Sequence, residues 1–223
     1  MRFLHANNKT NENMATKKST SSKKTSSSDS IFKTVKIGKQ EWMAENLNVD
    51  KFRNGDLIPE VKSQKEWEKA GQSGKPAWCN YDNNNINGEK HGKLYNWYAV
   101  NDPRGLAPEG WNIPSDEEWE QLAAYLGGEE DAGKKMKSKT GWDGTEDWPE
   151  GNGTDEYGFS GLPGGLRTHI GEFIKFGKYT SWWTSTESDT EGAWDRSLYY
   201  AFVNLDRGDN YGGEGLNVRC LKD

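Results

Sequence analysis

Residues 105–122 read GLAPEGWNIPSDEEWEQL and predict a turn followed by the best-defined helix of the chain. Ser115 occupies the N-cap position and Glu118 follows three residues later, which is the spacing of a capping box. The acids at 116–118 lie at the positive end of the helix dipole, and the glycines at 127–128 predict the helix end. One apolar face recurs at helical spacing: Trp119, Leu122, Ala123 and Leu126.

Several motifs along the chain carry a family resemblance. They are, in order, WMAENL at 42–47, LYNWYAV at 94–100, GWNIPSDEEW at 110–119, GFSGLPGG at 158–165, WWTSTE at 182–187 and VRCLKD at 218–223. Together they closely resemble the major paralogous domain first named from Fibrobacter succinogenes. More distantly, the helix after Ser115 resembles a segment of formylglycine-generating enzymes and of the wider C-type lectin fold.

The resemblance covers residues 31–223 and implies a fold for them. That fold is α+β and C-type-lectin-like, with short antiparallel sheets, one or two main helices and much irregular loop. The 26 glycines agree with many turns and argue against a helical bundle. The sequence departs from the family pattern at 212–217, GGEGLN, where the family usually has a shorter YGFS, so we expect the last loop to differ.

Residues 1–30 differ in composition from the rest of the chain. The Lys, Ser and Thr residues at 15–30 cannot form a core, so we expect a disordered N-terminal tether. The first 30 residues hold six basic and two acidic side chains, a net charge of +4. Because the whole chain has a net charge of −6, residues 31–223 carry −10. An acidic domain is a poor partner for nucleic acid. The tether is expected to be a solvated linker or a contact for an assembly partner.

Neither a membrane span nor a secretory signal is expected from the sequence. No run of about 18 apolar residues occurs, and the first 29 residues lack the apolar centre of a signal peptide. Met14 is an alternative start to the chain. Localisation stays open at this point, and the resemblance implies a cell-surface, secreted or virion-associated protein.

Other patterns predict shorter elements. Alternation predicts a hairpin over 34–43 with a turn at 38–39, and Ser63 caps a predicted short helix over 64–70. A weaker pattern predicts a helix at 131–138. Strands are expected at 77–81, 179–186, 196–204 and 216–221. The core face of the strand at 196–204 is expected to carry Leu198, Tyr200 and Phe202.

Catalytic and metal-binding patterns are scarce. His91 and His169 lie outside ligand motifs, and two cysteines are too few for a structural zinc site. Formylglycine-generating enzymes hold copper with a closely spaced cysteine pair, which this sequence lacks, so we expect no catalytic residues. Cys79 and Cys220 form either a disulfide or two buried thiols. The loop DNNNING at 82–88 offers oxygen ligands but no calcium-loop spacing, so we expect no cofactor, with calcium as the alternative.

Aromatic and hydrogen-bonding side chains gather between residues 183 and 211. Such mixtures suit recognition of sugars or of protein surfaces, and the C-type-lectin-like fold places its ligand surface in this C-terminal part. Solvated turns between strands are the alternative interpretation. The candidate ligand-binding residues are Trp183, Trp194, Arg196, Tyr199, Asn204, Asp206, Arg207, Asp209, Asn210 and Tyr211.

These patterns favour a non-catalytic recognition domain that binds a glycan or a protein on a cell surface. Some relatives diversify this surface as variable receptors, through diversity-generating retroelements, and residues 204–215 have the composition of such a region. One alternative is a structural or attachment component of a virion or pilus, joined through the N-terminal tail. The other is an oxidase of the formylglycine-generating type, against which the missing cysteine pair argues.

Overall fold

The computed structural model describes residues 32–146, 149, 151–188 and 191–223. Contacts divide the chain into two units, Met1–Ser30 and Ile31–Asp223. The first unit lies outside the described residues, and so does the predicted tether. The helices of the second unit are α1 (Gln64–Gln72), α2 (Asn85–His91), α3 (Trp97–Val100), α4 (Asp116–Tyr125) and α5 (Glu129–Met136), with a 3-10 turn at Tyr81–Asn83.

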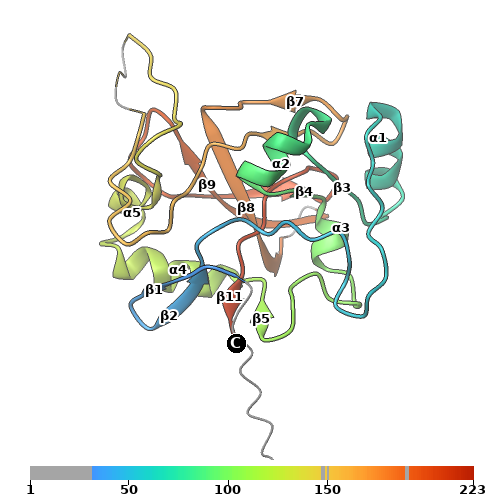
Figure 1. The fold of residues 1–223 in the computed structure, drawn as a ribbon, viewed down its shortest axis with the longest axis horizontal. Coiled ribbons are helices and arrows are strands. Elements are labelled where there is room, and N and C mark those ends of the chain that lie inside the picture. The colour runs from blue at the N-terminus through green and yellow to red at the C-terminus, as the bar shows by residue number, and fades with distance from the viewer. Residues whose placement is uncertain (1–31, 147–148, 150, 189–190) are drawn as a thin grey trace, which may run out of the picture. The chain divides into compact units, whose positions relative to one another are not determined.

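Short antiparallel strands make up the rest of the regular structure (Figure 1). A four-stranded sheet has the order β1-β2-β11-β5, a three-stranded sheet has the order β10-β9-β8, and β3-β4 and β6-β7 are two-stranded. The strands are β1 (Thr34–Ile37), β2 (Gln40–Met43), β3 (Trp78–Cys79), β4 (Leu94–Tyr95), β5 (Trp111–Asn112), β6 (Leu166–Arg167), β7 (Phe173–Ile174), β8 (Tyr179–Glu187), β9 (Gly192–Tyr199), β10 (Asp206–Tyr211) and β11 (Leu221–Lys222).

The helix predicted from residues 105–122 is confirmed as α4. The Ser115 side chain accepts the Glu118 amide while the Glu118 carboxylate accepts the Ser115 amide, so both halves of the capping box form. Past the C-cap at Leu126, the backbone turns at Gly127 and Gly128, whose φ angles of 105° and 102° are those that glycine tolerates best. Local sequence signals therefore define both ends of this helix.

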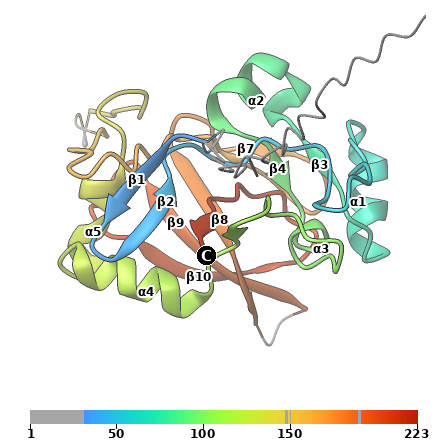
Figure 2. The same ribbon diagram turned by 60° about the horizontal axis from the view of Figure 1, so that its bottom comes forward.

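A cluster of aromatic rings in the core lies between α4 and two sheets. The ring of Trp119 in α4 packs against Trp42 of β2, with ring centroids 4.7 Å apart, and against Trp182 of β8, with centroids 5.7 Å apart. The Phe159 ring packs among these three indoles. Figure 2 shows the β1–β2 hairpin beside α4 and α5. A few large aromatic rings thus supply much of the core of a chain with a low apolar fraction of 32%.

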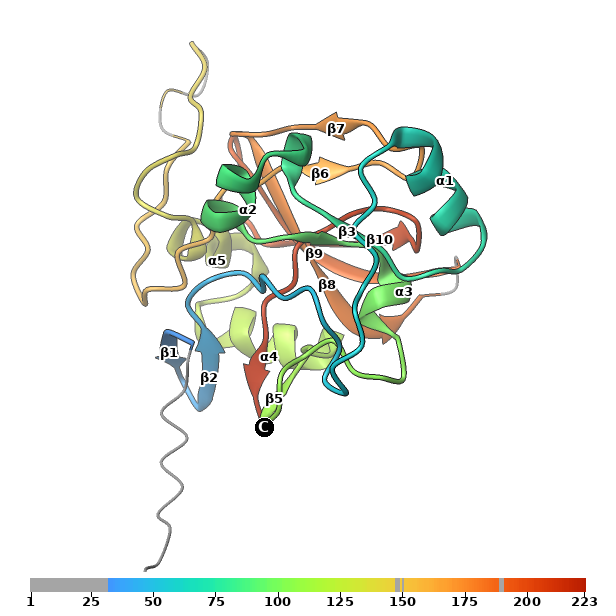
Figure 3. The same cartoon turned by 45° about the vertical axis from the view of Figure 1, so that its right-hand side comes forward.

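Helices α1 and α5 lie at opposite ends of the domain, with β8 and β9 between them (Figure 3). The N-cap of α1 at Ser63, the β1–β2 hairpin and the helix α5 agree with the sequence expectations. Short antiparallel sheets, helices and irregular loop confirm the α+β class. The finer C-type-lectin-like assignment stays a prediction.

Three local predictions are wrong. The Asn-rich segment 82–88 is not all loop, because the Asn84 side chain accepts the Ile86 amide and caps α2. The strand expected at 196–204 ends at Tyr199, and Phe202 is 51% exposed rather than in the core, although Leu198 is buried. Strand β11 begins only at Leu221, and the residues before it form isolated bridges to other segments.

Candidate functional site

Residues 206–211 belong to the stretch predicted as a strand-and-loop ligand surface, and they form strand β10. It pairs antiparallel with β9 over six residues, from Asp206 opposite Ser197 to Tyr211 opposite Gly192. Strand β9 pairs on its other side with β8, so β10 is the edge of the three-stranded sheet. Charged side chains are common on such edges because they discourage pairing with other chains. The composition that suggested a loop is therefore also that of a protected edge strand.

Two of the ten candidate residues lie inside the fold. Trp183 is fully buried, and its indole Nε1 donates to the Tyr95 carbonyl at 2.8 Å. Arg196 is also fully buried. Neither side chain faces solvent, so neither contacts a ligand at the surface. The other eight are partly buried or exposed: Trp194, Tyr199, Asn204, Asp206, Arg207, Asp209, Asn210 and Tyr211.

Asp116, in the first turn of α4, organises the buried end of this region. Its amide donates to Thr186 Oγ1 of β8 at 3.0 Å, which ties the helix start to the sheet. Its Oδ1 accepts Arg196 Nη2 at 2.7 Å and Nε at 3.2 Å, while its Oδ2 accepts Arg207 Nε at 2.8 Å. One carboxylate therefore bridges a buried arginine of β9 and a partly exposed arginine of β10.

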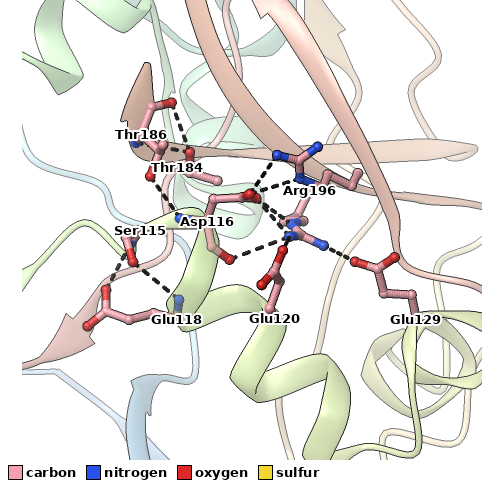
Figure 4. Close-up of polar contacts among 9 residues, drawn as sticks. Ser115, Asp116, Glu118, Glu120, Glu129, Thr184, Thr186 and Arg196 are labelled. Carbon is pink, nitrogen blue, oxygen red and sulfur yellow. Dashed lines mark hydrogen bonds and ion pairs between the residues drawn. The ribbon is translucent and has the colours of Figure 1, made fainter. Parts of the chain in front are cut away.

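Arg196 is balanced by more than one acid. Its Nη1 donates to the Glu129 carboxylate of α5, and Glu120 of α4 lies 3.8 Å from its Nη2. Figure 4 shows Arg196 between Asp116, Glu120 and Glu129. Burying a cation is costly unless it is paired and hydrogen-bonded. These contacts join α4, α5 and β9 through a single side chain.

The exposed end of the network is a stack of Arg207 on Trp194. The Arg207 guanidinium lies 3.4 Å from the centroid of the Trp194 ring, which is a close cation–π contact. Because Asp116 holds the same guanidinium, the stack is fixed from below. Arg207 keeps 34% of its side chain exposed and Trp194 is partly buried. The outcome is a rigid surface of one aromatic ring and one oriented cation.

The opposite face of the same strands carries a buried carboxylate. Asp195 is 1% exposed, and it accepts hydrogen bonds from Ser181 Oγ of β8 and from Asn210 Nδ2 of β10, the latter at 2.8 Å. Burial raises the pKa of Asp195 to about 6, and these two hydrogen bonds oppose the rise. Asn210, a candidate ligand residue, is thus engaged within the sheet.

Asp195 is expected to make stability depend on pH. Its folded pKa of about 6 lies above its ordinary 3.8, so its contribution is full below pH 3.8 and is lost as the pH rises through 6. We expect Asp195→Asn to be more stable than the parent at pH 7 by on the order of 2–3 kcal/mol. Urea unfolding at pH 4, 5, 6 and 7 measures this difference, which should shrink toward pH 4. Asp131→Asn, on exposed α5 surface, is the control, and an equal pH slope for parent and Asp195→Asn contradicts the prediction.

A second group of side chains surrounds Tyr211 at the end of β10. The Tyr211 ring meets the His169 ring edge-on, with centroids 5.7 Å apart, and Tyr211 is hydrogen-bonded to Tyr98 of α3. His169 Nδ1 lies 2.8 Å from a Glu214 carboxylate oxygen. Burial, followed by the Tyr211 contact, raises the pKa of Tyr98 to about 12, so its hydroxyl stays protonated. Sequence spacing gave no sign that these side chains meet.

The two cysteines are free thiols, which decides between the two alternatives left open by the sequence. Cys79 and Cys220 are fully buried in different core clusters. Burial raises the pKa of each thiol to about 12, so neither is ionised at neutral pH. Across the described residues there is no group of three or more His, Cys, Asp or Glu side chains placed to hold a metal ion. The described helices are also too short or too polar to cross a membrane.

Sequence reasoning missed the residues that hold this site in place. Asp116 was recognised only as a charge at a helix N-terminus, and Glu129 not at all. One signal did exist: of the three acids in the first turn of α4, Asp116 directly follows the N-cap. Which of the three points into the fold depends on where β9 and β10 pass, and spacing does not contain that information.

Comparison with known families places the chain. No curated protein and no solved structure gave a match. The family model described as the Fibrobacter succinogenes major domain matches residues 35–222, nearly the whole of the second unit. The motifs at 42–47, 110–119, 158–165 and 182–187 all fall within the matched range. The chain therefore belongs to the Fibrobacter succinogenes major domain family.

Proposed function

We propose that this domain is a non-catalytic recognition module that binds a glycan or a protein on a cell surface through β9 and β10. The observation that carries the proposal is the Trp194–Arg207 stack, fixed by Asp116. Aromatic and arginine side chains dominate binding energy where they are held in place before the ligand arrives. Here the ion pair with Asp116 holds the Arg207 guanidinium over the Trp194 ring before any ligand binds. A ligand that contacts the two side chains therefore does not have to immobilise them.

The chemistry of this surface suits both ligand classes. A partly exposed indole is a platform for the apolar face of a sugar ring or for a protein side chain, and an oriented guanidinium donates hydrogen bonds to hydroxyl or carboxylate oxygens. Tyr211 and His169 extend the aromatic surface at the far end of β10.

The non-catalytic part of the proposal is supported by the state of the reactive groups. Thiols with a pKa of about 12 supply no thiolate nucleophile at neutral pH. Arg196 and Asp116 are engaged with each other. An oxidase of the formylglycine-generating type needs a reactive cysteine pair, and in this structure the two thiols lie in separate clusters.

Strand β10 is also the segment we propose to vary among diversified copies. Arg207 and Asp209 are exposed on the outer face of β10, so their exchange changes the surface that a ligand would meet. Gly192 and Gly208 are different, since a Cβ on Gly192 would lie 1.8 Å from the Asn210 carbonyl and one on Gly208 would lie 2.9 Å from Asp195 Oδ1. We expect variation at the exposed positions and glycine at the other two.

Binding of the fluorescently labelled full chain to a broad glycan array, and to bacterial and host cells, tests the proposal. Saturable binding is expected, and Trp194→Ala and Arg207→Ala are each expected to weaken it by at least 10-fold because they remove the two halves of the stack. Tyr125→Ala is the matched control, an exposed aromatic residue of α4. A parallel series with a calcium chelator reports any metal requirement.

Two results contradict the recognition proposal. One is binding that Trp194→Ala and Arg207→Ala leave unchanged, which would place the ligand surface elsewhere. The other is a folded chain that binds nothing in either format, after which attachment to an assembly through residues 1–30 becomes the better hypothesis. Circular dichroism of each variant confirms that the comparison is made between folded proteins.

A further inference from the structure

A pocket of about 660 Å³ lies away from the candidate surface on β9 and β10. Segments far apart in the sequence form it: Lys33 before β1, residues 44–48 after β2, the end of α2 at 89–92, residues 138–140 after α5, residues 155–162, and Arg219. Small-molecule sites in proteins are roughly 300–1,000 Å³. Six parts of the chain thus meet around a space of the size of a ligand site.

Arg219 is a buried cation in the wall of this pocket. It is 1% exposed, and its guanidinium lies 4.5 Å from the Phe159 ring centroid and 5.8 Å from that of Trp182. Nη1 donates to the Met43 and Phe159 carbonyls, and Nε and Nη2 donate to Asn46 Oδ1. All of these acceptors are neutral.

The contrast with Arg196 shows what Arg219 lacks. Both are fully buried, but Arg196 has carboxylates of three acids within 4 Å, whereas no carboxylate in the described part of the chain lies that close to Arg219. Burial lowers the pKa of Arg219 to about 9, and the more distant Glu45 and Asp155 only partly offset this. A buried charge without a direct counter-ion is costly, so an anion in the pocket would relieve it.

Two lysines reinforce the positive side of the pocket. Lys90 and Lys139 line it, are exposed, and form no ion pair with any described residue. Lys33 is already paired with Glu45 at 2.6 Å. This leaves Lys90, Lys139 and Arg219 facing Glu89 and Asp155, a local excess of positive charge in a domain that carries −10 overall.

The remaining lining mixes neutral polar groups with a comparable amount of apolar surface. Asn48 and Thr140 contribute an amide and a hydroxyl, and Ala44 and Leu162 contribute aliphatic side chains. The hydroxyls of Ser138 and Ser160 already donate within the fold, to the Thr140 carbonyl and to Asp155 Oδ2. Glu89 and Asp155 disfavour a doubly charged anion such as phosphate. Such a mixed lining suits a singly charged ligand that carries both hydroxyl groups and C–H surface, as a sugar acid does.

We propose that this pocket binds a small hydroxylated carboxylate, a sugar acid or hydroxy acid. Its carboxylate lies toward Lys90 and Lys139, with Arg219 behind them as a fixed positive charge, and its hydroxyls meet the neutral side chains. The site is separate from the Trp194–Arg207 surface. Its test is therefore independent of whether that surface binds a glycan or a protein.

Sodium glucuronate is the probe, and the indole signal of Trp182 is the reporter. Trp182 Nε1 donates to Asn46 Oδ1 at 2.8 Å, the same oxygen that Arg219 contacts, so an anion near Arg219 is expected to shift that signal. The ¹⁵N-labelled full chain is titrated with glucuronate, acetate, methyl glucoside or phosphate at constant ionic strength. We expect a saturable shift with glucuronate, at least 10-fold tighter than with the other three.

The rim lysines provide variants that do not disturb the core. Lys90→Ala/Lys139→Ala is expected to weaken glucuronate binding by at least 10-fold, because it removes both direct contacts to the carboxylate. Lys65→Ala/Lys69→Ala, on the exposed side of α1, makes the same change in net charge outside the pocket and is expected to leave binding unchanged. Equal weakening by both pairs, equal binding of phosphate, or a glucuronate shift no larger than that of sodium chloride would overturn the proposal.

Discussion

Replacing Asp116 by asparagine is expected to lower the free energy of unfolding by about 3 kcal/mol, the lower end of the cost of removing one partner from a buried ion pair, because Glu129 still contacts Arg196. Arg196 is fully buried, and Asp116 Oδ1 accepts hydrogen bonds from both its Nε and its Nη2. Asparagine keeps the shape of the side chain but not its charge. It also presents an amide N–H to one of two arginines, which have no acceptor to offer.

The neighbouring acid of the same helical turn provides the matched control. Glu117 is exposed, lies in the first turn of α4, and forms no ion pair with any described residue. Glu117→Gln therefore loses only the favourable interaction with the helix dipole, about 0.3–1 kcal/mol. Urea unfolding of both variants measures the difference. Equal effects of the two substitutions would show that Asp116 acts only as a helix-terminal charge.

Asp116→Asn also connects stability to the proposed ligand surface. Arg207 is held over Trp194 by the same carboxylate, so losing the charge frees the guanidinium as well. Trp194→Ala removes the ring but leaves the Asp116–Arg196 pair in place. The two variants are thus expected to differ in the property that they lose. Asp116→Asn lowers both the free energy of unfolding and ligand binding, whereas Trp194→Ala lowers mainly ligand binding.

Sequence patterns predicted the elements whose determinants are local. The capping box of α4 needs only Ser115 and Glu118 at the correct spacing, and it formed as predicted. The Ser63 cap of α1 and the β1–β2 hairpin are of the same kind. In each case the hydrogen-bond partners lie within a few residues of each other, so the sequence contains the full pattern.

The β9–β10 region was mispredicted because its determinants are not local. Residues 206–211 read DRGDNY, a composition depleted in strand-forming side chains, yet they form a strand because β9 supplies its hydrogen bonds. Once β10 is a strand, the turn before it must fall near residues 200–205, and Phe202 is carried to the surface.

The candidate site was predicted only in its exposed half. Trp194 and Arg207 were selected because their side chains suit ligands, and the structure brings them into contact. The buried half consists of ion pairs whose partners are separated by 67 to 91 positions in the chain. The amino-acid composition does not show which of these distant residues pair. Arg196 was selected for the same chemistry, but its role is to support the surface from within.

Replacing Gly133 by alanine is expected to destabilise the protein by about 3 kcal/mol or more, although alanine is the better helix former. Gly133 lies in α5, and there helix propensity alone favours alanine by about 1 kcal/mol. The turn after β9 packs directly on this helix: the Lys134 amide donates to the Val203 carbonyl and the Leu205 amide donates to the Glu129 carbonyl, each at 2.8 Å. A Cβ on Gly133 would lie 2.0 Å from the Asn204 carbonyl oxygen and 2.7 Å from that of Val203.

Backbone atoms held by hydrogen bonds on both sides of Gly133 cannot move aside as a side chain would. The added methyl group must therefore separate α5 from the turn, at a cost at or above the upper end of the range for overpacked sites, about 1–3 kcal/mol. Ala124→Gly, at an exposed position of α4, measures the propensity difference alone and is expected to cost about 1 kcal/mol. Urea unfolding compares the two variants with the parent. A Gly133→Ala protein as stable as the parent, or more stable, would mean that α5 does not pack on the β9–β10 turn as the structure shows.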